Sequence, residues 1–290
     1  MKTKLTVENG DVRQALQGFL SSLLTSGAVD MLYLPMRTPS GTVTPALVSK
    51  PALLVHADIL APVMGINSAT QVAKLSQREP RPKVGAVLRS CEMRALVELV
   101  KLQQASIVDL VTISLDCAGN YAAAECQEKS GGTNREIWRT FYQPNVLTTP
   151  QPMVEQRAAC QICEQPVYDG ADIVLELIGS DFSSGIHLTV RDDLAGQLGL
   201  QPAETDGNRA ALLEKLVQNR IAERDRVFEE IRLRTGGGED IARLFAACIR
   251  CHNCMNVCPV CYCKTCVFKS EIFDHEPMQY VTWVKQKGAF

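Results

Sequence analysis

The chain has almost no excess of either charge: 30 Lys and Arg residues stand against 32 Asp and Glu residues, a formal net charge of −2. That balance excludes a strongly basic protein that coats nucleic acid and a protein with an acidic tail, so we expect no nucleic-acid partner. Histidine is also scarce. The four histidines are too few and too dispersed to indicate a histidine metal site: His56, His187, His252 and His275.

Long apolar runs are missing as well. No stretch reaches the roughly 18 apolar residues that a membrane-spanning helix needs, so we expect no membrane span. The opening MKTKLTVENGD carries positive charge but lacks the apolar segment of a secretory signal. There is no internal repeat and no low-complexity tract. These absences predict a cytoplasmic globular protein, and a content of 46% hydrophobic and 21% charged residues suits a packed core.

Cysteine is what the sequence has in excess, with 12 residues. Thiols in a reducing cytosol do not form disulfides, so metal is the best explanation for so many. Five are scattered: Cys91, Cys117, Cys126, Cys160 and Cys163. The other seven crowd into 19 residues: Cys248, Cys251, Cys254, Cys258, Cys261, Cys263 and Cys266. This contrast, with the hinge Gly236-Gly237-Gly238, predicts two units, residues 1–235 and 236–290.

The first unit alternates strand-like and helix-like segments. Helices are expected at 11–24, with Asp11 as N-cap, and at 91–104, directly after a strand at 84–88. Close succession of strand, helix and strand implies right-handed parallel crossovers and an α/β core. Further strands are expected at 31–34, 52–55, 107–113, 171–177 and 186–191, and a surface loop at 130–154. A long helix is expected at 206–234, with an apolar face of Leu213, Leu216, Val217, Ile221, Phe228 and Ile231.

The terminal cysteine run, residues 248–259, has the spacing C-x2-C-x2-C-x3-C-P. Bacterial ferredoxins use this run to hold one cubane cluster with three thiolates while the fourth reaches a different cluster. Zinc sites usually pair two knuckles a dozen or more residues apart, so the spacing favours iron–sulfur over zinc. Cys261, Cys263 and Cys266 follow without repeating the pattern. One of them would be the fourth ligand of the first cluster. The other two, with Cys258, would give a second cluster in this unit only three ligands.

Four of the scattered cysteines have positions that suit a further site. Cys91 lies where a strand ends and a helix begins, which lowers a thiol pKa and directs backbone donors toward an anion. Cys117 also closes a strand, and Cys160 and Cys163 form a C-x-x-C pair. Parallel strands end on one rim, where α/β proteins place their sites. The four thiols are candidates for one more cubane, and the alternative is that Cys91 and Cys117 are small buried apolar side chains.

Several motifs follow one another in the first unit: Lys83-Val-Gly-Ala-Val-Leu-Arg-Ser-Cys91-Glu-Met-Arg-Ala-Leu, Asp116-Cys117-Ala-Gly, Ala159-Cys160-Gln-Ile-Cys163-Glu and Ala171-Asp172-Ile. In this order they resemble the beta-subunit family of coenzyme F420-reducing hydrogenases and formate dehydrogenases. The resemblance covers about residues 26–191, and the terminal run resembles the ferredoxin segment of formate dehydrogenase-type members. Many members carry that segment at the N-terminus, whereas this chain carries it at the C-terminus.

The resemblance implies a mixed-sheet, flavin-binding α/β core with a small C-terminal ferredoxin-like iron–sulfur domain. It implies FAD and two or three 4Fe-4S clusters, and it raises the four-thiol cluster above its alternative. Electrons would pass between the deazaflavin coenzyme F420, FAD, the clusters and a partner subunit of hydrogenase, formate dehydrogenase or heterodisulfide reductase type. The role of Cys126 stays open, and no catalytic residue is assigned.

The resemblance also suggests where FAD would bind. Family members have a glycine-rich turn followed by a strand that ends in arginine, and the matching residues are Gly179, Ser180, Ser183, Ser184, Gly185 and Arg191. An ordinary hairpin loop is the alternative for this turn. The chain has no G-x-G-x-x-G fingerprint, which disfavours the usual Rossmann mode of dinucleotide binding.

Three other functions are compatible with the same sequence. The flavin subunit could use a nicotinamide coenzyme in place of the deazaflavin. The chain could be a non-catalytic iron–sulfur relay adaptor that has lost flavin. It could also be a zinc-stabilised binding module, which predicts no cluster absorbance and no loss of metal in air.

Overall fold

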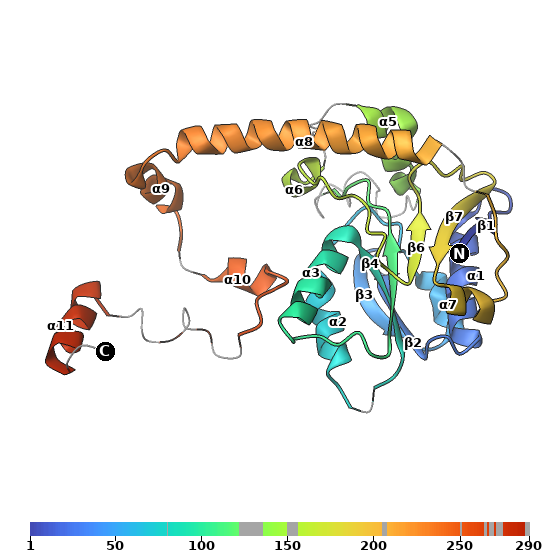
Figure 1. The fold of residues 1–290 in the computed structure, drawn as a ribbon, viewed down its shortest axis with the longest axis horizontal. Coiled ribbons are helices and arrows are strands. Elements are labelled where there is room, and N and C mark those ends of the chain that lie inside the picture. Colours follow the sequence, from blue (N-terminus) through green and yellow to red (C-terminus); the bar gives the residue numbers. More distant parts are fainter. Residues whose placement is uncertain are drawn as a thin grey trace.

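A computed structural model of the chain describes residues 1–79, 81–121, 136–149, 156–204, 208–249, 251–263, 266, 270 and 275–287. Cys126 lies outside them. The core is a seven-stranded sheet in the order β1-β7-β6-β5-β4-β2-β3 (Figure 1). The strands are β1 (Lys2–Thr6), β2 (Met31–Arg37), β3 (Val43–Val48), β4 (Val84–Arg89), β5 (Leu110–Leu115), β6 (Ile173–Glu176) and β7 (Gly185–Val190).

The sheet is mixed, as expected for an α/β core. Its centre, β2-β4-β5-β6, is parallel, while β3 on one side and β7 and β1 on the other pair antiparallel. The strands at 171–177 and 186–191 are confirmed as the antiparallel pair β6 and β7. The carboxyl ends of the four parallel strands therefore meet at one edge of the sheet.

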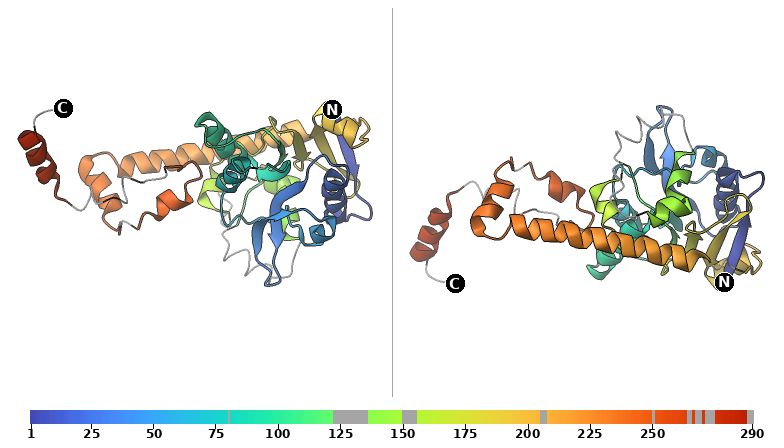
Figure 2. Two further views of the ribbon diagram at one scale, coloured as in Figure 1. Left: turned by 90° about the horizontal axis from the view of Figure 1, so that it is seen from below. Right: turned by 90° about the horizontal axis from the view of Figure 1, so that it is seen from above.

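Helices cover both faces and the carboxyl edge of the sheet (Figures 1 and 2). Those of the first unit are α1 (Val12–Thr25), η1 (Pro51–His56), α2 (Ala69–Ser76), α3 (Ser90–Lys101), η2 (Ile137–Tyr142), α5 (Pro144–Thr148), α6 (Ala158–Gln161), α7 (Asp192–Gln197) and α8 (Asn208–Arg234). No described helix has both the length and the apolar character needed to cross a membrane.

Alternating side chains divide the core into two layers. Leu32 and Leu34 of β2 pack with α1, η1 and α7, whereas Tyr33 between them packs with α2 and α3. In β4, Val87 belongs to the first layer, and Ala86 and Leu88 belong to the second. This is the period-two placement of a strand that is buried on both faces. A third apolar cluster lies under α8 and contains Tyr121, Phe141, Leu147, Leu212 and Leu216, among others.

The expected helices at 11–24 and 91–104 are confirmed as α1 and α3. The Asp11 carboxylate caps α1 by accepting a hydrogen bond from the Gln14 amide at 2.9 Å. The expected strand at 52–55 is wrong, because this segment is the 3-10 helix η1 and the strand β3 precedes it. Pro51 begins η1, and proline has a fixed φ and no amide hydrogen for a strand ladder.

The expected surface loop at 130–154 is wrong for its described part, 136–149. That part forms η2 and α5, and Trp138 and Phe141 are fully buried there. Trp138 packs edge-on against Phe182 with ring centroids 5.0 Å apart. Large apolar side chains, rather than regular spacing, hold this segment in the core.

The long helix is confirmed as α8, which has 27 residues and extends beyond the core over its second half (Figure 1). The expected apolar face of α8 is buried only over the first half of the helix. Leu216 is buried there, but Phe228 and Ile231 are 43% and 49% exposed. The outer half has no sheet beneath it, so its apolar side chains remain in solvent.

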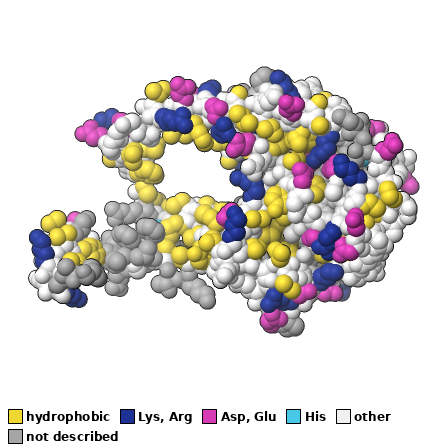
Figure 3. All heavy atoms as spheres, viewed as in Figure 1, with side chains coloured by type: hydrophobic (Ala, Val, Ile, Leu, Met, Phe, Trp, Pro, Cys, Tyr) yellow, Lys and Arg dark blue, Asp and Glu magenta, His cyan; other side chains and the backbone are white. Residues whose placement is uncertain are grey.

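The division into two units stays a prediction, and the predicted second unit follows α8. Its described helices are α9 (Gly238–Phe245), α10 (Asn253–Val257) and α11 (Pro277–Lys287), and its described residues contain no strand. A ferredoxin-like fold for this unit stays a prediction. The chain turns back after α9, and Val260 packs against the α2–α3 layer. Hydrophobic side chains gather on both sides of the opening between outer α8 and the returning segment (Figure 3).

The close approach of β2 and β4 at Gly85 is testable. A methyl group at Gly85 would lie 2.7 Å from Leu32 Cδ2, and Leu32 is fully buried. We therefore expect Gly85→Ala to destabilise the protein by about 1–3 kcal/mol in urea unfolding. The matched control is Gly18→Ala on the exposed side of α1, where an added methyl meets nothing within 4 Å. Alanine is the better helix former, so this change should add about 0.5–1 kcal/mol. An unchanged stability of the Gly85 variant would contradict the tight strand packing.

Candidate metal centre

Two of the scattered cysteines follow neighbouring strand ends. Arg89, the last residue of β4, is the register partner of Leu115, the last residue of β5. Cys91 and Cys117 each lie two residues farther along, Cys91 in the first turn of α3. The structure thus brings these two positions together at the carboxyl edge, as the sequence predicted.

The C-x-x-C pair reaches the same edge through hydrogen bonds. Cys160 lies in α6, and Cys163 follows two residues after this helix. The Cys117 amide donates to the Pro166 carbonyl at 2.8 Å, and the Arg157 amide donates to the Asn120 carbonyl at 3.0 Å. Arg157 precedes and Pro166 follows the C-x-x-C pair, so these two hydrogen bonds hold Cys160 and Cys163 beside Cys117.

The pKa values of the thiols reflect this convergence. Burial raises the pKa of Cys91 to about 12, and the nearby Cys117 and Cys163 add to the shift. Burial also raises the pKa of Cys117, where Arg89 opposes the shift and Cys160 adds to it. The expectation of a lowered pKa for Cys91 at a helix start is therefore wrong for the metal-free site, because loss of solvent outweighs the helix dipole.

A cubane cluster and a single metal ion require different arrangements of their ligands. No group of three or more His, Cys, Asp or Glu side chains within the described part of the chain could hold one metal ion. In a cubane each thiolate binds its own iron atom, so the four sulfurs lie farther apart than the ligands of one ion. The four thiols come from three segments and are each partly exposed, which is compatible with that requirement.

Two buried arginines flank the thiols. Arg89 is 6% exposed and Arg220 is 1% exposed. Both donate to backbone carbonyls, and neither forms an ion pair with any described residue. The Glu92 carboxylate acts on Arg89. Buried positive charge that is not balanced is costly, so the guanidinium group of Arg220 in particular fits an anionic group such as a thiolate-bound cluster.

Helix α8 is seated on this edge by a third arginine. Arg209 at the start of α8 forms an ion pair with the fully buried Asp116, the residue before Cys117. Its Nη2 donates to Asp116 Oδ1 at 2.9 Å, and its Nε lies 3.4 Å from Glu176 Oε2. Sequence analysis missed Arg209, Arg220 and Asp116. The two arginines are 11 residues apart, about three helical turns, so they lie on one face of α8. Other arginines of the same helix are exposed, so the spacing alone does not single out this pair.

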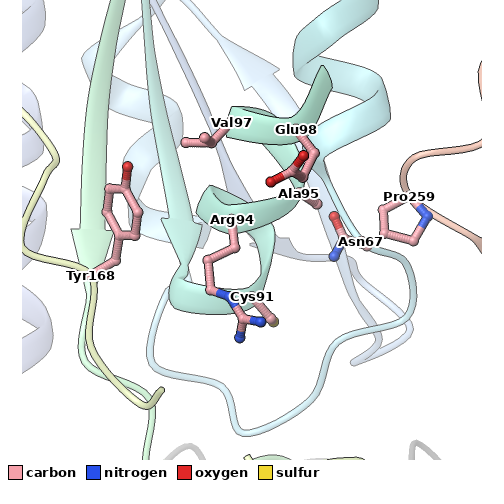
Figure 4. Close-up of a pocket in the computed structure, with 8 residues that line it drawn as sticks. All are labelled: Asn67, Cys91, Arg94, Ala95, Val97, Glu98, Tyr168 and Pro259. Atoms are coloured by element: carbon pink, nitrogen blue, oxygen red, sulfur yellow. The ribbon is translucent and has the colours of Figure 1, made fainter. Parts of the chain in front are cut away.

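A pocket adjoins the thiol site on the outer side of α3 (Figure 4). Its volume is about 420 Å³. Cys91, Arg94 and Glu98 line it from α3, Tyr168 from the segment after the C-x-x-C pair, and Pro259 from the terminal run. Because Pro259 directly follows Cys258, the core site and the terminal run border the same pocket.

The terminal cysteines themselves are more open to solvent. Cys258 and Cys266 are half-buried, and the other five are exposed: Cys248, Cys251, Cys254, Cys261 and Cys263. His252 precedes α10 in the left-handed backbone region with φ of 57°. The ligation of a cluster by this run stays a prediction.

The residues expected to contact FAD lie at both ends of β7. Gly179 has φ of +82°, and an added Cβ would lie 2.9 Å from Arg209 Cα, so glycine is required there. The turn adjoins the thiol site, because the Ile178 amide donates to Asp116 Oδ2 at 2.9 Å. Arg191 follows the far end of β7 and forms ion pairs with Asp172 and Asp193.

The serines and Gly185 of this turn already have partners within the chain. Ser180 Oγ donates to the Glu176 carbonyl at 2.5 Å, and Ser183 Oγ donates to the Asp181 carboxylate at 2.7 Å. Ser184 Oγ accepts from Lys4 Nζ at 3.2 Å, and Gly185 pairs with β1. The turn is a hairpin connection in its own right, and its contact with FAD stays a prediction.

No family model matches the chain, whereas comparison with individual known proteins shows clear similarities. The chain is 23% identical over 235 residues to the F420-dependent formate dehydrogenase 1 subunit beta of Methanococcus maripaludis, covering 66% of this chain and 58% of the relative. It thus spans less than two thirds of that relative's length. A chain of the F420-reducing [NiFe] hydrogenase complex from Methanosarcina barkeri has a similar fold, with a TM-score of 0.53 and 14% identity, covering 82% of this chain and 94% of the other. The resemblance seen in the cysteine motifs is confirmed.

The raised pKa of Cys91 predicts slow alkylation of the metal-free protein. With a pKa of about 12, only about one Cys91 thiol in ten thousand is ionised at pH 8, and the thiolate is the nucleophile. We expect iodoacetamide to label Cys91 at least about a hundredfold more slowly than an ordinary thiol at pH 8. Its rate should keep rising with pH up to about 12. The exposed Cys248 is the internal control, with both rates read by peptide mass spectrometry. Equal rates at pH 8 would contradict the burial of Cys91.

Proposed function

We propose, from the relation to F420-dependent formate dehydrogenase beta subunits, that this chain is an electron-transfer subunit of an oxidoreductase complex. Cys91, Cys117, Cys160 and Cys163 would hold one 4Fe-4S cluster at the carboxyl edge of the sheet. The observation that carries the proposal is the convergence of these four thiols from three segments beside two buried arginines.

The terminal run extends this proposal. Its seven cysteines would hold one or two further 4Fe-4S clusters: Cys248, Cys251, Cys254, Cys258, Cys261, Cys263 and Cys266. Pro259 and Cys91 line one pocket, which supports direct electron exchange between the two cysteine groups. Partner subunits of hydrogenase, formate dehydrogenase or heterodisulfide reductase type would exchange electrons with the terminal unit.

FAD is the proposed cofactor next to the core cluster. A bound flavin supplies the chemistry that links a two-electron coenzyme with one-electron clusters. The proposed FAD contact is the turn before β7, which lies near Cys117 and contains Gly179, Ser180, Ser183, Ser184 and Gly185. Arg191 lies at the other end of β7 and would contact only a ligand that extends along this strand. The surrounding residues leave Cys91 and Cys117 only partly exposed to water.

The cluster proposal predicts the metal content of the chain. Protein purified without oxygen should contain iron, acid-labile sulfide and FAD. Cys117→Ser should remove about four iron atoms per chain, because loss of one buried ligand opens the cubane. Cys126→Ser is measured alongside, and its iron content shows whether this cysteine, which has no assigned role, is also a ligand. Iron analysis and electron paramagnetic resonance measure both variants, and zinc without flavin in the anaerobic protein would overturn the proposal.

The coenzyme can be identified by reducing the flavin. Reduced coenzyme F420 is expected to bleach the flavin absorbance of the anaerobic protein, and the cluster band should then fade as electrons pass on. Reduced nicotinamide coenzyme, tested in parallel, should leave both bands unchanged. If only the nicotinamide coenzyme bleaches the flavin, then the nicotinamide coenzyme and not F420 is the substrate. A protein with clusters that neither coenzyme reduces would be a relay adaptor.

A further inference from the structure

Arg220 is a fully buried charged side chain with no charged partner in the described parts of the chain. Its Nη1 donates to the Cys163 carbonyl at 3.3 Å, and its Nη2 donates to the Ala118 carbonyl. Its Nε is buried and has no hydrogen-bond partner. Since Ala118 follows Cys117, this one guanidinium joins the two cysteine segments of the candidate metal centre.

Arg89 supplies a second positive charge at the same edge. It donates to the carbonyls of Ala61 and Val63, the latter at 3.3 Å. None of the four carbonyl acceptors of the two arginines carries a net charge. Arg89 lies two residues before Cys91, and Arg220 contacts the carbonyl of the residue after Cys117, so both charges lie beside the thiol site.

The carboxylates nearest to this edge are already engaged. Glu92 accepts the amides of Ser68 and Arg89, both at 2.9 Å, and thereby caps α3. Asp116 is neutralised by Arg209. The donors to Glu92 are neutral amides, so Glu92 keeps its charge and offsets that of Arg89. The charge of Arg220 has no counter-charge among the described residues.

An iron–sulfur cluster supplies the missing charge. A cubane held by four thiolates is a dianion when oxidised and a trianion when reduced. Adjacent positive charge stabilises the more negative form more strongly, and the effect is large where water is excluded. Burial alone acts in the opposite direction, because it disfavours the trianion.

We propose that Arg220, assisted by Arg89, sets the reduction potential of the core cluster by balancing the charge added on reduction. Arg220 is a positioning residue: it contacts the backbone at Cys163 and Ala118 and acts on the cluster through its charge. The inference rests on the proposed cluster at Cys91, Cys117, Cys160 and Cys163.

The test is a redox titration of the full-length, cluster-bearing protein under anaerobic conditions, followed by electron paramagnetic resonance. The core signal is identified as the one that Cys117→Ser removes. Arg220→Gln should favour the oxidised core cluster at least tenfold, a shift of about 59 mV to more negative potential for one electron. Arg220→Lys keeps the charge and should shift the equilibrium less than threefold. Lys215→Gln removes an exposed positive charge from the same helix and should also shift it less than threefold.

Each outcome decides one question. If the core signal of Arg220→Gln has an unchanged potential, this inference is overturned and the proposed function stands. If the wild-type protein has no core signal, the proposed function itself is overturned. If Arg220→Gln folds without iron, retention of iron by Arg220→Lys supports the inference, and loss from both overturns it. If Arg220→Gln does not fold, Arg89→Gln and Arg89→Lys are compared in the same way. If neither glutamine variant folds, a shift above tenfold in Arg220→Lys overturns the inference.

Discussion

Burial of positive charge under helix α8 is the constraint on which this structure depends. Arg209 and Arg220 lie on one face of the helix, three turns apart, with Leu212 and Leu216 between them. Arg209 is anchored by Asp116, which also accepts the amide of Ile178 after β6. Arg220 reaches the backbone beside two cysteines. The helix thus closes the carboxyl edge of the sheet through polar groups, and apolar packing alone would not fix its register there.

The parallel centre of the sheet explains why chemistry gathers at this edge. Paired strand ends put the residues after β4 and β5 side by side, and the short α6 segment is hydrogen-bonded next to them. The same edge receives the turn after β6 and, through Pro259, the returning terminal run. Segments far apart in the sequence therefore meet where backbone amides and buried charges are already oriented.

Hydrophobic periodicity was sufficient to predict most of the sheet and the helices α1, α3 and α8. It failed at η1, where Pro51 overrides an apolar run, and at η2, where Trp138 and Phe141 are buried without a regular period. The cysteine positions were predictable because strand ends of a parallel sheet share a rim. The arginines of α8 were not, because a buried guanidinium looks like a solvent-facing residue until its tertiary partners are known.

The course of α8 has a consequence for how the two cysteine groups communicate. The helix is about 40 Å long, and its outer half carries the chain away from the core before α9 and α10 bring Pro259 back to α3. The terminal run is therefore tethered, and its effective concentration at the core is set by chain geometry. Encounter between the two groups is intramolecular and independent of dilution, whereas a separate ferredoxin would have to reach the same pocket by diffusion.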